Sequence, residues 1–237
     1  MTSDQPQSIL AHLDELRWRL VKIAAAVLIG GIVAFVFVDP IRIILEQPFF
    51  AATDTSEFQT LRVGEQWGIW MRLSLFGGVI LASPIVLYQI WAFINPALKQ
   101  SERKWAIPIV AALVFLFVSG VAFGYWSLPR GLEFLLNIFP GVETNLQLGE
   151  YYSFTLRFLF AFGVAFLYPV FLYAAGAAHL VTSAQLASGR RWAILVIVVV
   201  AAAITPSGDA FTLLVLSIPL YVMYEVTYWL IRLTLKR

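Results

Sequence analysis

The feature that most constrains this chain is a series of long apolar stretches that carry no charge. Residues 23–38, 73–98 and 105–129 contain no Asp, Glu, Lys or Arg, and residues 158–189 form a fourth such stretch. A membrane-spanning helix needs about 20 mostly apolar residues, because its rise of about 1.5 Å per residue must cover a hydrocarbon layer of about 30 Å. These stretches therefore favour membrane-spanning helices over elements of a soluble core.

The composition supports the same class of protein and argues against several functions. Of the 237 residues, 60% are apolar and 13% are charged, with a net charge of +2, whereas soluble domains have about 25% charged residues. A nucleic-acid-binding protein needs a concentrated basic face, which this charge balance does not indicate. The chain has no cysteine, and its two histidines, His12 and His179, lie far apart in sequence. We therefore expect no metal centre, no cofactor and no enzymatic activity.

We expect an all-α integral membrane protein that forms a single membrane domain over residues 1–237, with six transmembrane helices in a concave bundle. The spans are expected at about residues 20–38, 70–94, 105–126, 158–180, 192–204 and 211–231. The fifth apolar run has about thirteen residues and covers only about 20 Å. We therefore expect spans five and six to be short and to form a hairpin that either tilts little or thins the bilayer locally.

Six spans place both termini on one side of the membrane, and the charges indicate which side. Eleven of the sixteen basic residues lie in the two terminal segments and the loops near residues 95–104 and 181–191, whereas nine of the fourteen acidic residues lie in the opposite loops. Because cytoplasmic loops carry an excess of Lys and Arg, we expect both termini in the cytoplasm. The first eighteen residues lack the pattern of a cleaved secretory signal, so we expect the N-terminus to be retained.

The two external loops, at about residues 39–69 and 127–157, are rich in apolar side chains. Phe49 and Trp67 in the first loop and Phe134 in the second are examples. Such residues indicate short interfacial helices that cap the external face.

An amphipathic helix is expected at residues 8–20, on the cytoplasmic side. His12, Glu15 and Arg19 share one of its faces, opposite the apolar positions. In one interpretation, Glu15 and Arg19 form a solvated pair at i, i+4, and the arginines only set the topology. In the other, Glu15 belongs to an acidic receptor surface, since a carboxylate can accept two parallel hydrogen bonds from a guanidinium group. Glu102 lies in a basic loop on the same side of the membrane. It either neutralises the charge of that loop or, together with Glu15, flanks one groove of the receptor surface.

Several motifs, in this order along the chain, resemble the TatC family of twin-arginine protein translocase subunits. They are His12-Leu13-x-Glu15-Leu16-Arg17-x-Arg19, Pro48, Ala82-x-Pro84, Tyr88-Gln89-x-Trp91-x-Phe93-x-x-Pro96-x-Leu98, Glu102-Arg103, Gly120-x-x-Phe123-x-Tyr125, Thr205-Pro206, Pro219-Leu220-Tyr221 and Tyr224-Glu225. Each motif is weak alone, but the ordered set covers nearly the whole chain.

The resemblance implies a signal-peptide receptor and core translocase subunit of the cytoplasmic (inner) membrane, which exports folded proteins with the proton gradient. It implies that Glu15 and Glu102 contact the paired arginines of a twin-arginine signal peptide, with Phe93 and Leu98 packing nearby. Arg17 and Arg19 would shape the same surface. The implied partners are TatA-type and TatB-type single-span subunits in an oligomeric complex, together with the cargo proteins and the lipid bilayer.

The resemblance also singles out residues outside this surface. Pro48, Tyr125 and Asp209 match positions of the external cap, although they also suit a loop proline, an interfacial tyrosine and a helix cap. Gln89 and Glu225 are the polar residues expected within the membrane, where Glu225 is either buried and partly protonated or directed toward the interface. Leu167 stands where the family usually has a glutamate, so the contact of that glutamate with partner subunits is either lost or replaced by Tyr168, Gln89 or a polar residue of the partner.

Three other functions fit the composition less well. A secondary transporter would show internal repeats and polar residues near the bilayer midplane, and no convincing repeat is present. An intramembrane enzyme needs a nucleophile and base, or a metal set, that the motifs do not supply. A scaffold without a ligand would leave the Glu15 and Glu102 surface unexplained.

Overall fold

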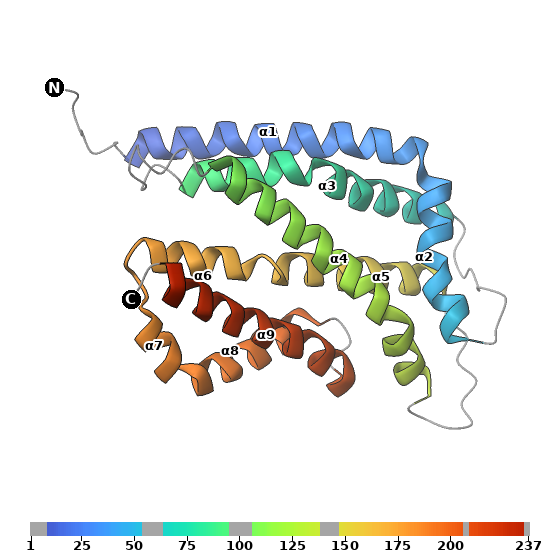
Figure 1. Cartoon of the computed structure of the whole chain (residues 1–237). Coiled ribbons are helices and arrows are strands. Elements are labelled where there is room, and N and C mark those ends of the chain that lie inside the picture. Colours follow the sequence, from blue (N-terminus) through green and yellow to red (C-terminus); the bar gives the residue numbers. More distant parts are fainter. Residues whose placement is uncertain (1–8, 54–63, 95–105, 138–146, 206–208, 235–237) are drawn as a thin grey trace. The chain divides into compact units, whose positions relative to one another are not determined.

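The computed structural model is helical throughout and describes residues 9–53, 64–94, 106–137, 147–205 and 209–234. The helices are α1 (Ile9–Val36), α2 (Val38–Ala52), α3 (Glu65–Ile94), α4 (Ala106–Leu136), α5 (Leu148–Ala165), α6 (Tyr168–Ala177), α7 (Ser183–Ser188), α8 (Arg190–Ile204) and α9 (Ala210–Thr234) (Figure 1). The chain divides into two compact units, residues 1–38 with 71–114 and residues 39–70 with 115–237.

The structure confirms an all-helical protein with several helices suited to a membrane. Five helical segments of the described residues are long and apolar enough to span one: Leu13–Val36, Glu65–Phe93, Ile107–Leu136, Leu148–Ala177 and Ala210–Thr234. Large apolar side chains on these helices point outward, including Ile32 at 70% and Val36 at 74% exposure. Apolar surface of this kind is stable in lipid.

The last two expected spans differ from each other. Helix α8 has 15 residues and covers about 22 Å, so its span remains a prediction. Helix α9 has 25 residues and covers about 37 Å. The expectation that span six is short was therefore wrong. Neither Pro219 nor Glu225 ends the helix, and Glu225 forms an ion pair with Arg190.

Other boundaries also differ from those expected. The expected loop at residues 127–157 is largely helical, since α4 continues through Leu136 and α5 begins at Leu148. Hydropathy locates the apolar stretch, whereas the helix continues past Pro129 into more polar sequence. The fourth expected span is interrupted at residues 166–167, because Pro169 lies in the first turn of α6, a position that favours a new helix. In the first loop, α2 is the expected short helix.

Close helix contacts in both units depend on glycine. In the first unit, a Cβ added at Gly78 of α3 would lie 2.5 Å from the backbone nitrogen of Gly31 in α1. In the second unit, a Cβ at Gly120 of α4 would lie 2.5 Å from the carbonyl oxygen of Phe162 in α5. Small residues at these positions let the backbones touch, as is common in membrane helices.

Candidate functional site

The first polar cluster joins Glu15 and Arg19 of α1 to Gln89 of α3, and is called the Glu15 cluster below. The Arg19 Nε and Nη2 atoms donate hydrogen bonds to Glu15 Oε1, at 3.0 and 2.5 Å. The Arg19 Nη1 atom donates to Gln89 Oε1 at 3.1 Å. The i, i+4 pair of the first interpretation is therefore present, but it is also attached to a second helix.

The contact between Gly30 and Gly78 explains how two residues 70 positions apart meet. Helices α1 and α3 touch there, since a Cβ at Gly30 would lie 2.7 Å from the Gly78 carbonyl oxygen. Arg19 precedes Gly30 by eleven residues, and Gln89 follows Gly78 by eleven. Equal spacing from one crossing point on two antiparallel helices brings the two side chains to the same height.

Glu15 keeps one oxygen atom without a hydrogen bond to any described residue. Both donors from Arg19 go to Oε1, and none is found at Oε2. The Glu15 side chain is 27% exposed and that of Arg19 is 20% exposed. The carboxylate is thus held in place and still open on one side, where it can accept hydrogen bonds from a cation.

The other residues of the expected surface are placed only in part. Arg17 is exposed on α1, and Phe93 is half-buried on α3, one turn after Gln89. Glu102 and Leu98 lie outside the described residues.

Glu225 lies in α9 and forms a second cluster, called the Glu225 cluster, with Arg190 of α8 and Tyr221. Arg190 donates from Nε to Oε1 at 2.8 Å and from Nη2 to Oε2 at 3.0 Å. The Tyr221 hydroxyl also donates to Oε1, at 3.0 Å. The hydrogen bond to Glu225 raises the pKa of Arg190, so its guanidinium group stays charged. Sequence reasoning had counted Arg190 only as a topology signal and had missed this partner.

Two of the expected cap residues form hydrogen bonds in the second unit. Tyr125 of α4 donates a hydrogen bond from its hydroxyl to the Ile44 carbonyl oxygen at 2.8 Å, and lies 3.2 Å from Gln47 Oε1. Both acceptors belong to α2, which contains Pro48. Asp209 accepts from the Thr212 backbone nitrogen at 2.7 Å and from the Thr212 hydroxyl at 2.5 Å, so it caps α9, as the helix-cap interpretation expects.

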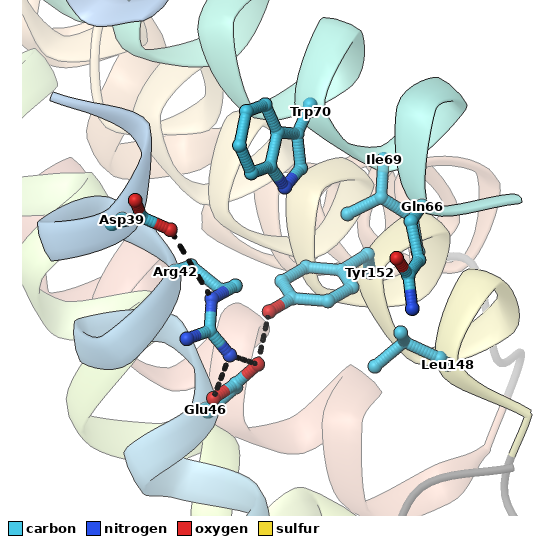
Figure 2. A pocket seen from close by; sticks show the side chains of 8 residues that line it. All are labelled: Asp39, Arg42, Glu46, Gln66, Ile69, Trp70, Leu148 and Tyr152. Atoms are coloured by element: carbon cyan, nitrogen blue, oxygen red, sulfur yellow. Dashed lines mark hydrogen bonds and ion pairs between the residues drawn. The ribbon is translucent and has the colours of Figure 1, made fainter. Parts of the chain in front are cut away.

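A cavity of about 260 Å³ lies beside α2, between the first turns of α3 and α5. Figure 2 shows Arg42 and Glu46 on the α2 side of the cavity, with the Tyr152 hydroxyl pointing toward them. Arg42 Nη1 donates to both Glu46 oxygens, at 2.9 and 3.1 Å, and the Tyr152 hydroxyl donates to Glu46 Oε1 at 2.8 Å. Burial lowers the pKa of Arg42, but the charge of Glu46, its hydrogen bond and the nearby Tyr152 and Asp39 together outweigh burial, so the pKa is raised and the guanidinium stays charged. Sequence analysis missed this cluster, although Arg42 and Glu46 have the i, i+4 spacing of a helical pair.

Leu167 is buried, at 8% exposure, in the turn between α5 and α6. The Tyr168 hydroxyl, one of the polar groups considered as its substitute, donates to the Leu220 carbonyl oxygen. Gln89, the other, accepts from Arg19. Both groups are therefore engaged within the chain. Within the described residues, no group of three or more His, Asp or Glu side chains is arranged to hold a metal ion.

Comparisons with known proteins agree on one family. The family model described as "Sec-independent protein translocase protein (TatC)" matches residues 11–219. A TatC protein of Aquifex aeolicus is 38% identical over 230 residues, covering 95% of each chain. A TatC protein of Carboxydothermus hydrogenoformans is 34% identical over 230 residues, covering 96% of this chain and 93% of its own.

A plant relative and a crystal structure extend this similarity. The chloroplastic TATC protein of Arabidopsis thaliana is 34% identical over 236 residues, which cover 99% of this chain and 69% of that protein. A crystal structure described as the twin arginine translocase receptor TatC matches with a TM-score of 0.80 and 38% identity, covering 92% of this chain and 98% of the other.

Proposed function

Because the chain belongs to the TatC family of Sec-independent protein translocase proteins, we propose that it is the translocase subunit that binds twin-arginine signal peptides. Its relatives are named for transport across membranes rather than for catalysis. The proposed ligand is the pair of arginines in the signal peptide of a folded cargo protein.

The observation that carries the proposal is the state of the Glu15 carboxylate. Oε1 is held by Arg19, while Oε2 meets no donor from the described residues. An incoming guanidinium group can donate to Oε2 without displacing Arg19. A carboxylate fixed beforehand loses less conformational entropy on binding than a freely rotating one. Arg19 thus acts as a positioning residue.

The remaining residues of the site are proposed from the family motifs. Glu102 would accept from the second arginine of the signal peptide, and Phe93 and Leu98 would pack against its apolar part. Arg17, which is exposed two residues after Glu15, would shape the field around that surface. Two carboxylates favour arginine over lysine, because the planar guanidinium offers parallel donors whereas the ammonium group is a point charge.

The test is binding of a twin-arginine peptide and its twin-lysine counterpart to the full chain in lipid nanodiscs. We expect the native chain to prefer the twin-arginine peptide, and Glu15→Gln and Glu102→Gln each to weaken its binding about tenfold or more, since a hydrogen bond to a charged group contributes about 1.5–3 kcal/mol. Glu150→Gln, at an exposed carboxylate of α5, is the matched control. Equal binding of both peptides by the native chain and the double variant would refute the proposal.

We also propose six spans with both termini in the cytoplasm of a bacterial-type inner membrane. The charge distribution supports this topology. Because the chain has no cysteine, single-cysteine variants give a clean test with a membrane-impermeant maleimide. Asn137→Cys, after α4, should react from outside intact cells, whereas Ser188→Cys, at the end of α7, should react only after permeabilisation. The reverse pattern would contradict the topology.

The proposed partners are TatA-type and TatB-type single-span subunits, and the proposed energy source is the proton gradient. Family membership supports a translocase complex, and Pro48, Tyr125 and Asp209 would keep the external ends of the helices in place for it. Co-purification of single-span subunits with the chain, and loss of cargo export on collapse of the gradient, test these two points. Export that continues without a gradient would refute the second.

A further inference from the structure

The hairpin of α8 and α9 ends in three arginines, Arg190, Arg191 and Arg232, which are called the arginine end below. Helices α8 and α9 lie alongside each other (Figure 1). Arg190 and Arg191 begin α8, and Arg232 lies in the last turn of α9. Since the two helices are antiparallel, all three side chains are at the same end of the hairpin.

Tyr228 of α9 brings two of these guanidinium groups together. The Cζ atom of Arg190 lies 4.9 Å from the centre of the Tyr228 ring. Arg232 Nη1 donates a hydrogen bond to the hydroxyl of the same tyrosine at 3.0 Å. Tyr228 is buried, at 6% exposure, in a hydrophobic cluster of the second unit. Its ring is therefore held in place, and so are the contacts that it makes with Arg190 and Arg232.

The arginine end carries more positive charge than the described residues neutralise. Glu225 is paired with Arg190. In the part of the chain that the structure describes, no carboxylate lies within ion-pair distance of Arg191 or Arg232, and both side chains are exposed. Cations at one end of the hairpin that lack a counter-charge repel each other, and an anion bound there reduces that repulsion.

The aromatic side chains beside the arginines indicate the depth in the membrane at which these arginines lie. Arg191 faces the ring of Trp192, at 6.0 Å from its centre, and Arg232 faces that of Trp229, at 5.3 Å. Trp192 is 61% exposed and Trp229 is 49% exposed. Exposed tryptophans at the ends of membrane helices lie at the level of the lipid headgroups. The unneutralised arginines are therefore at headgroup depth, where the available anions are lipid phosphates.

We propose that the arginine end binds the headgroup of an anionic phospholipid, with Arg191 and Arg232 donating to phosphate oxygens. The planar guanidinium group suits phosphate because it offers two parallel donors. Basic sites between membrane helices bind anionic headgroups in this manner. Binding would hold the start of α8 at the membrane surface and so set the depth of this 15-residue helix.

The test is retention of phosphatidylglycerol against phosphatidylcholine by the purified full chain, counted by native mass spectrometry at equal lipid concentration. Each arginine near an anionic headgroup changes affinity about fivefold, so Arg191→Gln and Arg232→Gln should each lower phosphatidylglycerol affinity about fivefold, and the pair about 25-fold. Phosphatidylcholine binding should not change. Each single variant tests the proposal, even if the double variant does not fold.

Arg130→Gln is the matched control, because Arg130 also faces an exposed tryptophan, Trp126, at 4.6 Å from the ring centre. It removes the same charge and the same kind of ring contact from another helix. An equal loss of lipid in this control would show a general charge effect and overturn the proposal. Displacement of the lipid by inorganic phosphate at the same concentration would also overturn it, as would native affinity in the single variants.

Discussion

Glu15 and Glu225 are both partly buried carboxylates that meet an arginine, yet their oxygen atoms are used differently. Glu15 accepts both of its hydrogen bonds at Oε1. Glu225 accepts at both oxygens from Arg190 and again at Oε1 from Tyr221. The side chains are almost equally exposed, at 27% and 26%, so burial does not separate them.

The difference lies in the number of donors that each carboxylate already has. Glu225 has a donor for each oxygen, and a new ligand would have to break an ion pair, so its role is to join α8 and α9. Glu15 has an oxygen to spare and can bind without such a loss. Two acids that look alike in a membrane sequence thus differ in function, one as part of the proposed receptor surface and one as a structural pair.

The largest effect is expected from Gly78→Ala, which disrupts the contact between α1 and α3 that positions the Glu15 cluster. The added Cβ would lie 2.5 and 2.7 Å from backbone atoms of Gly31, and backbone cannot move aside as a side chain can. Overpacking of this kind costs about 1–3 kcal/mol. We expect a lower unfolding temperature and weaker binding of the twin-arginine peptide.

Gly68→Ala is the control for this prediction, because it lies on the same helix with no atom within 4 Å of the added Cβ. It should change stability by less than about 0.5 kcal/mol. Equal effects of the two variants would show that the contact between α1 and α3 does not support the site.

The second prediction is that Glu15→Gln affects mainly peptide affinity, whereas Glu225→Gln affects mainly stability. Glu15→Gln should weaken peptide binding about tenfold and lower the unfolding temperature less than Glu225→Gln does, because Arg19 keeps its hydrogen bond to Gln89. Glu225→Gln should lower the unfolding temperature, since Arg190 loses its charged partner, and should leave peptide affinity within about twofold. Peptide titration and thermal unfolding of both variants in the same nanodiscs measure this. If both variants lose affinity equally, the proposed distinction fails.

The third prediction concerns the attachment of Arg19 to α3. Gln89→Leu removes the acceptor of Arg19 Nη1 while keeping a side chain of similar size. A hydrogen bond contributes about 1 kcal/mol, so we expect peptide affinity to fall about fivefold through looser positioning of Glu15. Gln89→Glu restores an acceptor and should recover most of the affinity. Native affinity in Gln89→Leu would mean that the i, i+4 pair alone positions Glu15.

The smallest effect is expected at Asp209, which lies in neither cluster. Asp209→Ala removes the cap of α9 and should cost about 1 kcal/mol of stability, whereas Asp209→Asn keeps an acceptor and should cost less. Neither should alter peptide affinity. A loss of export in Asp209→Asn at native stability would indicate a role beyond capping.

Sequence patterns predicted those features that depend on neighbours along the chain. The cap at Asp209 and the pair of Glu15 and Arg19 follow from spacings of three and four residues. The same reasoning missed Arg190 as the partner of Glu225, which lies 35 positions away. It also missed Tyr152 as a donor to Glu46 across 106 positions, because no periodicity relates residues so distant.

The sequence by itself determined that the chain is a helical membrane protein of the TatC family. The length of the apolar stretches, the placement of the charges and the order of the motifs can all be read directly from the order of the residues. The tertiary structure decided which carboxylate oxygens are occupied and which remain open. That depends on where backbones cross, as at Gly30 and Gly78. The crossing of two helices decides which acceptor a donor side chain can reach. A pattern of neighbouring residues in the sequence does not contain that information.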